Sequence, residues 1–73
     1  MHRIYFDENE RDQDGRYDLG FPGSLESIRP IANELHDGMH VILFGDEDLE
    51  LEAVLEFDKK YQRWMARAVR RVA

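Results

Sequence analysis

Apolar and polar residues alternate along the second half of the chain, which predicts extended strands. In the segment LELEAVLEFD, residues 49–58, one side of an extended chain carries only apolar residues: Leu49, Leu51, Ala53, Leu55 and Phe57. The opposite side is acidic apart from Val54, a pattern typical of an antiparallel strand covered on one side only. Before it, MHVILF (39–44) predicts a buried strand and GDED (45–48) predicts a turn.

A second turn, at DKKYQR, would bring the last segment of the chain back beside this strand. The register that pairs Phe57 with Trp64 puts the apolar residues of both strands on one face. The further pairs in this register are Leu55–Ala66, Ala53–Ala68 and Val54–Arg67. Arg67 then lies diagonal to Glu52 and Glu56, so arginines of the last segment would neutralise acids of its neighbour.

Residues 63–73 also have a helical alternative. Within them, four apolar residues form a stripe at helical spacing: Met65, Ala68, Val69 and Val72. Alanine, arginine and methionine favour helices as well. We expect a strand over residues 63–67, and we expect the rest of this segment to fray or to form a short helix.

The first half of the chain has fewer regular elements. HRIYFD, residues 2–7, is rich in β-branched and aromatic residues and predicts a short strand. Residues 8–23 show no apolar periodicity and contain Pro22-Gly23, a pair that suits the centre of a type II turn. We therefore expect one long loop, and loops of this length in small domains often carry function.

A helix of about residues 28–36 is predicted next. Apolar residues recur there at i, i+3, i+4 and i+7: Ile28, Ile31, Ala32 and Leu35. Ser27 can cap its start, and Gly38 follows its end. With that start, Pro30 is the third helical residue, whose N–H has no partner in a helix; a start at Ser24 would put it where it breaks a bond.

The segment DGMHVILFGDEDLELEAVLEFDKKYQRWMA resembles the hairpin core of small bacterial SH3-like β-barrel domains over residues 38–66. Such domains have a strand led by glycine, a tight turn, a long strand with a central Ala-Val, a second turn and Trp-x-Ala. The chain lacks the tandem tryptophans of eukaryotic SH3 domains, so binding of proline-rich ligands is not implied. We expect an α+β, mainly β domain: a curved antiparallel sheet or open SH3-like barrel with one short helix.

Length and charge set further limits. A chain of 73 residues has room for one core, so residues 1–73 are expected to form a single domain. All 16 acidic residues lie in residues 1–58 with four arginines, which gives −12, whereas residues 59–73 carry six bases and give +6. The absence of cysteine suits a reducing compartment, and no segment is apolar enough for a signal peptide or a membrane span. We expect a cytoplasmic protein.

Candidate chemistry is sparse. Counting from Glu10, the run ERDQDG resembles the start of a calcium loop, with Asp12 and Asp14 at alternate positions. Position 12 of that loop is Phe21, which has no oxygen to offer, and the entering helix is missing, so we expect no calcium site. His36 and His40 have zinc spacing but Gly38 separates them. No triad or desolvated acid is indicated, so we expect neither a cofactor nor an enzyme.

The function expected from the sequence is therefore binding. We expect a non-catalytic protein-interaction module that uses the acidic loop 8–18 to engage an unidentified, basic partner protein. The candidate binding residues are Asp12, Asp14, Asp18 and the tyrosines Tyr17 and Tyr61, which we expect to be exposed. One alternative is an acidic mimic of nucleic acid that acts as an inhibitor or immunity-like protein. A third hypothesis is nucleic-acid binding through the basic C-terminal segment, which the net charge of −6 disfavours. No membrane partner is expected, and the chain is expected to be a monomer.

Overall fold

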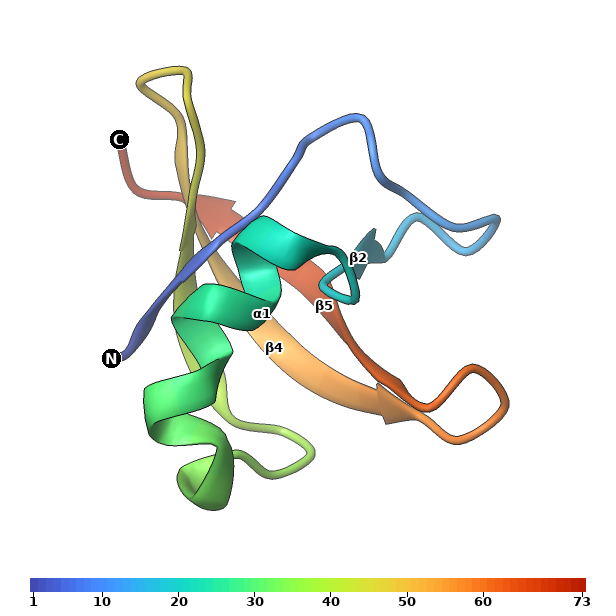
Figure 1. The fold of residues 1–73 in the computed structure, drawn as a ribbon. Coiled ribbons are helices and arrows are strands. Elements are labelled where there is room, and N and C mark those ends of the chain that lie inside the picture. Colours follow the sequence, from blue (N-terminus) through green and yellow to red (C-terminus); the bar gives the residue numbers. More distant parts are fainter.

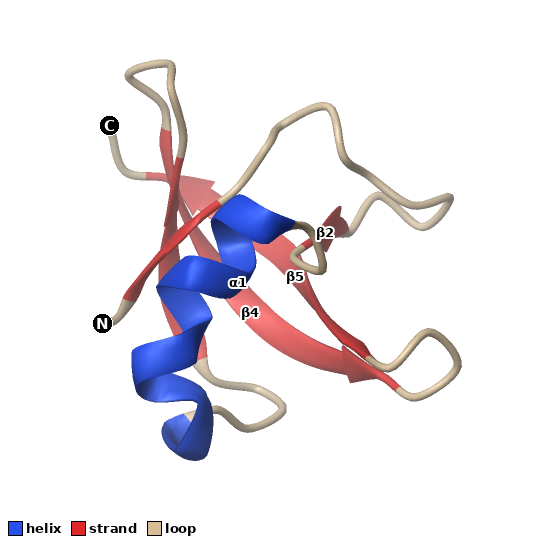
Figure 2. Cartoon of the chain, viewed as in Figure 1, coloured by secondary structure: helices blue, strands red, loops and turns tan.

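The computed structural model describes residues 1–73 as a curled five-stranded sheet with one helix across it (Figures 1 and 2). The strands lie in the order β1-β3-β4-β5-β2. None of the helical segments combines the length and the apolar character that crossing a membrane requires. The elements are β1 (Arg3–Tyr5), β2 (Tyr17–Asp18), α1 (Pro22–Ile28), the 3₁₀ helix η1 (Arg29–Glu34), β3 (His40–Phe44), β4 (Glu50–Asp58) and β5 (Arg63–Arg71).

The hairpin of β4 and β5 has the register that the alternation predicts. Phe57 lies opposite Trp64, with ring centroids 5.1 Å apart in an edge-to-face arrangement. The three further pairs, Leu55–Ala66, Ala53–Ala68 and Val54–Arg67, are also confirmed. The strand prediction for 63–67 is therefore right, and β5 continues to Arg71 in place of the alternative helix. Between Ala68 and Arg70 the register shifts by one residue, which makes Val69 a bulge.

One pair of strands departs from the expected antiparallel sheet. β1 runs parallel to β3, with Arg3, Ile4 and Tyr5 beside Ile42, Leu43 and Phe44, whereas the other pairs are antiparallel. Parallel neighbours need a connection that crosses over the sheet, usually with a helix. The segment between β1 and β3 supplies that connection, because it contains α1 and η1. The sheet is therefore mixed.

The helix begins earlier than predicted. α1 starts at Pro22, so Pro22 and Gly23 open a helix instead of forming a type II turn. Proline is well suited to the first helical position, where its missing N–H has no intrahelical partner. The α-helix then stops at Ile28 and continues as η1, with Pro30 near the start of the 3₁₀ turn. In an α-helix Pro30 would leave the carbonyl of Glu26 without a donor, which explains the change of helix type.

Ser27 consequently has a different role from the predicted helix cap. Its hydroxyl oxygen accepts the backbone N–H of Tyr5 at 3.1 Å, and the fully buried Ser24 donates its hydroxyl to the carbonyl of Tyr5. Residues three apart lie on one side of a helix, so both serines face the outer edge of β1. Through them α1 satisfies the backbone of an edge strand that would otherwise be open.

The core lies between α1 and the concave side of the sheet (Figure 2). The long loop expected over 8–23 is interrupted, because Tyr17 and Asp18 form β2 against β5 and Tyr17 and Leu19 point into the core. The two edge strands, β1 and β2, do not touch, so the sheet is a half-barrel, and the expected mainly β, α+β class is confirmed. The core cluster comprises Ile4, Phe6, Tyr17, Leu19, Ile28, Val41, Leu43, Leu51, Ala53, Leu55 and Ala66.

Candidate binding site: an acidic pocket beside Tyr5

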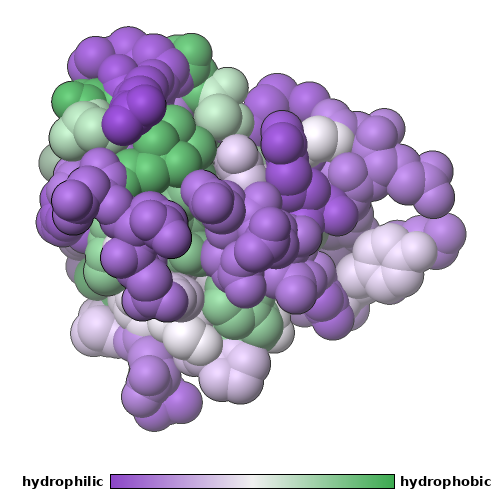
Figure 3. All heavy atoms as spheres, turned by 90° about the horizontal axis from the view of Figure 1, so that it is seen from above, coloured by the Kyte–Doolittle hydropathy of each residue, from purple (hydrophilic) through white to green (hydrophobic).

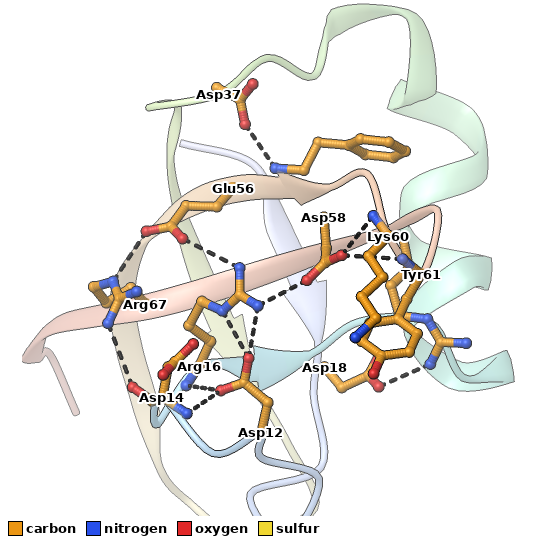
Figure 4. A network of polar contacts seen from close by, with 12 residues as sticks. Asp12, Asp14, Arg16, Asp18, Asp37, Glu56, Asp58, Lys60, Tyr61 and Arg67 are labelled. Carbon is orange, nitrogen blue, oxygen red and sulfur yellow. Dashed lines mark hydrogen bonds and ion pairs between the residues drawn. The ribbon is translucent and has the colours of Figure 1, made fainter.

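The acidic loop predicted to bind a partner is tied to the sheet by Arg16. The guanidinium of Arg16, only 15% exposed, donates to Asp12 at 2.7 Å and to Asp58 at 2.8 Å, and it lies 3.4 Å from Glu56 (Figure 4). The other oxygen of Asp12 accepts the backbone N–H groups of Asp14 and Arg16. Asp12 is therefore occupied within the molecule, and its role is to hold the loop against β4.

The charges around Arg16 shift the ionisation of their partners. Burial acts to raise the pKa of Asp12, but the backbone and side-chain hydrogen bonds from Arg16 outweigh it, so the pKa is lowered. The pKa of Asp58 is lowered first by the backbone N–H of Tyr61 and then by Arg16. The pKa of Glu56 is lowered chiefly by Arg67. These carboxylates are stabilised in their charged form by contacts that already exist in the fold.

The remaining predicted site residues do not gather in one place. Asp18 accepts from Arg63 at 2.8 Å and from the backbone N–H of Gly20 at 2.7 Å, so it too is occupied. Tyr17 is 7% exposed and packs edge-to-face on Phe6, so the expectation that it is exposed is wrong. Its position opposite Ala66 on the concave face of the sheet explains the burial.

Two of the predicted residues are exposed. The Asp14 side chain makes no ion pair, and only its backbone carbonyl meets Arg67, at 3.4 Å. Tyr61 is 60% exposed in the turn between β4 and β5, beside the amine of Lys60. These two residues lie on different loops, and neither lines either of the two hollows beside Tyr5 that are described below.

Half of the bases in the C-terminal segment are paired with acids, two of them across the predicted hairpin. Three arginines of β5 form ion pairs with carboxylates at 2.8–3.0 Å: Arg63 with Asp18, Arg67 with Glu56, and Arg70 with Glu52. Of the six bases in residues 59–73, only Lys59, Lys60 and Arg71 lack a carboxylate partner. The charge asymmetry of the sequence is thus partly compensated, by two ion pairs across the β4–β5 hairpin and one between β5 and β2.

A pocket of about 210 Å³ lies where the two parallel strands end. β1 ends at Tyr5 and β3 at Phe44, and these residues are paired in the parallel register. The chain segments that follow the two strands therefore leave the sheet side by side. They are held close, since the N–H of Phe6 donates to the carbonyl of Phe44 at 2.8 Å. A Cβ on Gly45 would lie only 3.0 Å from the carbonyl oxygen of Phe6, so this close approach favours glycine.

Four carboxylates line this acidic pocket: Asp7, Glu8, Asp46 and Glu47. None of them forms an ion pair. Tyr5, Phe6 and Leu49 supply the apolar part of the lining. The hydroxyl of Tyr5 donates to Asp46 at 2.8 Å, and this hydrogen bond raises the pKa of Tyr5. The pocket thus combines uncompensated negative charge with an aromatic wall, a combination that suits a cation.

Tyr5 is shared by a second, shallower hollow on its other side, lined by Gly23, Glu26 and Ser27. The Tyr5 ring packs edge-to-face on Phe21 and on Phe44, with centroids 6.3 and 5.8 Å apart. All three rings are partly exposed, so they form an aromatic ridge along β1 and β3. A ligand in the acidic pocket can therefore extend over an apolar surface.

Sequence reasoning missed this site because it did not foresee the parallel pair. The acidic runs Asp7-Glu8 and Asp46-Glu47 each follow a predicted strand, but they are far apart in the chain. The order strand, helix, strand over residues 2–44 was the available signal, since it is the pattern of a parallel crossover unit. Recognising it would have placed the two acidic runs at one edge of the sheet.

The structure contains no group of three or more histidine, cysteine, aspartate or glutamate side chains arranged to hold a metal ion. The Nδ1 atom of His36 lies 3.0 Å from the carbonyl oxygen of Asp37, and that of His40 lies 2.7 Å from a carboxylate oxygen of Glu52. The two imidazoles therefore have separate local partners. Comparison of the chain with protein-family models, with curated proteins and with solved structures found no match.

Proposed function

We propose that this protein is a non-catalytic interaction module that binds a basic segment of a partner protein in the acidic pocket. The observation that carries the proposal is the contrast in charge compensation: the acids on β4 have cationic partners within the fold, and the four pocket acids have none. Uncompensated carboxylates close together repel one another, so a bound cation lowers the energy of the site.

The shape of the site limits what it can take. A volume of about 210 Å³ accommodates a side chain but not a larger ligand. Arginine and lysine both present a cation at the end of an apolar stem, and Tyr5 and Leu49 offer apolar surface for such a stem. Residues that flank the basic side chain in the partner would lie on the aromatic ridge of Phe21, Tyr5 and Phe44.

Of the 8–18 loop, the proposed binding surface keeps only Glu8 and Asn9. Asp12 and Asp18 are engaged with Arg16 and Arg63, so their carboxylates are not free to meet a partner without breaking those contacts. We also propose that residues 38–66 are related to SH3-like barrels, which the sequence pattern supports. A cytoplasmic location is proposed as well, and the absence of cysteine supports it.

The test is a titration with an acetylated glycine-arginine peptide that carries three arginines. Binding is monitored through the backbone amide resonances of residues 5–9 and 45–49. The matched variants each remove two negative charges. Asp7→Asn with Glu47→Gln changes the pocket, and Glu10→Gln with Asp14→Asn changes the loop outside it. We expect the pocket variant to bind about fivefold or more weakly and the loop variant to bind like the wild type. Equal weakening by both pairs would show that only net charge matters and would refute the pocket.

A further inference from the structure

Strand β5 has an edge that is paired with another strand over only part of its length. It is nine residues long, and β4 pairs with it along most of its length. On its other side, β2 pairs only with Met65 and Ala66, so residues 67–71 have no neighbouring strand there (Figure 1). The opposite edge of the sheet differs, because the two serines of α1 occupy the outer side of β1.

The backbone of this edge is positioned to accept another strand. The carbonyl of Trp64 accepts the N–H of Leu19, so the backbone groups of Trp64 face the β2 side. Because backbone groups alternate in direction along a strand, the N–H and carbonyl groups of Ala66 and Ala68 also face the β2 side. Ala66 is paired with Tyr17, whereas Ala68 is exposed and has no partner on that side. The N–H and carbonyl of Ala68 are therefore available for hydrogen bonds to an added strand.

The edge is also held in place and carries apolar side chains. Beyond β5, the N–H of Val72 donates to the carbonyl of Glu50, and the N–H of Glu50 donates to that of Ala73, both at 2.8 Å. Val69 is 54% and Val72 42% exposed. Figure 3 shows the molecule from above. Hydrophobic residues gather on the left, the side on which both termini lie in Figure 1, and the opposite side, where the 8–16 loop lies, is hydrophilic. An incoming strand thus meets an ordered template with exposed valines.

The charges of the edge select its occupant. Arg67, Arg70 and Arg71 are exposed along it. Arg67 and Arg70 are paired with Glu56 and Glu52, whereas Arg71 meets no side-chain carboxylate and its Nε donates to the Ala73 oxygen at 3.1 Å. A second copy of the chain that paired β5 with β5 would bring these arginines against one another, and the bulge at Val69 would twist the two edges apart. An extended segment with acidic side chains meets complementary charge instead.

We propose that residues 67–71 bind an extended acidic segment of another protein as a sixth strand of the sheet. The backbone of Ala68 supplies hydrogen bonds, the exposed valines contact apolar side chains, and Arg71, which has no side-chain carboxylate partner, pairs with a carboxylate of the added segment. None of these residues lines the acidic pocket. The two surfaces differ in charge and position, so either can fail its test without affecting the other.

The experiment uses a blocked peptide that alternates valine with glutamate, and a second that alternates valine with lysine. Amide resonances and hydrogen exchange of the full chain are followed during each titration. We expect the glutamate peptide to shift residues 67–71 saturably and to protect the N–H of Ala68, and the lysine peptide to have no such effect. Shifts of residues 67–71 that depend on protein concentration without peptide would indicate a second copy as occupant and overturn the proposal.

Two variants separate strand addition from simple charge attraction. Ala68→Pro removes the outward N–H, and proline is tolerated at the edge of a sheet. This variant is expected to bind the glutamate peptide about tenfold or more weakly. Ala68→Val keeps that N–H and is the matched control. Arg71→Glu leaves the internal ion pairs intact and is expected to shift preference toward the lysine peptide. Unchanged affinity in both Ala68→Pro and Arg71→Glu, with the fold retained by circular dichroism, would contradict strand addition at this edge.

Discussion

The carboxylates on the outer face of β4 and those of the acidic pocket have the same chemistry but different surroundings. On β4, Glu50 pairs with Arg3, Glu52 with Arg70, and Glu56 with Arg67. In the pocket, the carboxylates of Asp7, Glu8, Asp46 and Glu47 have no cationic partner. The acids of β4 contribute to the fold, and the acids of the pocket leave negative charge exposed for a ligand.

This difference follows from the strand directions. β4 and β5 are antiparallel, so acidic and basic faces of one hairpin lie side by side and compensate each other. β1 and β3 are parallel, so two acidic segments that follow them meet at one edge with no basic segment between them. Local acidity alone thus does not identify a binding surface, since what matters is whether the fold supplies the counter-charge.

The largest effect on stability is expected from removing Arg16. Arg16→Met leaves Asp12 and Asp58, both largely covered, without their charged partner. A fully buried pair broken in this way costs about 3–5 kcal/mol, and partial solvation here reduces the expected loss to about 2 kcal/mol. Chemical denaturation measures it. Arg29→Met removes an exposed arginine without an ion pair and should change stability by less than about 0.5 kcal/mol. Equal losses in both variants would contradict the role of Arg16.

Acid should weaken the compensated region. The pKa values of Asp12, Glu56 and Asp58 are lowered in the folded chain from ordinary values of 3.8 for aspartate and 4.5 for glutamate. A depressed folded pKa contributes stability that is present above the unfolded pKa and lost as the pH falls through the folded pKa. The free energy of unfolding should therefore fall as the pH drops below about 4.5, and less steeply in Arg16→Met. A slope unchanged by that substitution would show that Arg16 does not set these pKa values.

A smaller effect is expected from the pair of Glu52 and Arg70, which lie 2.9 Å apart. Arg70 is 60% exposed, so the coupling energy from a double-mutant cycle of Glu52→Ala and Arg70→Ala should be about 0.5 kcal/mol. It should decrease at high salt, because exposed charges are screened. A coupling above about 2 kcal/mol would mean that this pair, and not apolar burial, sets the register of the hairpin.

The smallest effect on stability is expected in the pocket. Asp7→Asn with Glu47→Gln removes uncompensated charges, and the asparagine keeps an oxygen for the backbone N–H of Asn9. The free energy of unfolding should change by less than about 0.5 kcal/mol, with any change in the direction of greater stability. Thermal unfolding checks this. A loss of stability as large as that of Arg16→Met would show that Asp7 and Glu47 stabilise the fold, which would contradict their role as free pocket acids.

The hairpin could be predicted from the sequence because local alternation and long-range packing favour the same register. Any shift by one residue between Phe57 and Trp64 would turn apolar side chains to solvent. The helix start could not be predicted in the same way. Ser27 has the residue type of a cap, but its hydroxyl is engaged by Tyr5, a partner 22 residues away in the chain. The burial of Tyr17 depends equally on distant contacts, with Phe6 and Ala66.

For the acidic pocket, the sequence could predict the residues that line it but not that they come together. The two acidic runs are visible in the sequence, and Gly45 is a typical turn residue. Their approach depends on the parallel register of Tyr5 with Phe44, which crossover connections allow but local pattern does not specify. The compensation of Glu52 and Glu56 was predictable because it follows from the hairpin register. The partners of Glu50 and Asp58, and the lack of compensation in the pocket, follow from tertiary structure.

The most direct test follows the side-chain carboxyl carbon resonances during one titration with the three-arginine peptide. The pocket acids Asp7, Glu8 and Glu47 should shift saturably, with one common dissociation constant. Glu52 and Glu56 should stay unchanged, because Arg70 and Arg67 already occupy them. Shifts spread evenly over both groups, or confined to β4, would contradict the claim that the pocket acids, and not the paired acids of β4, bind the cation.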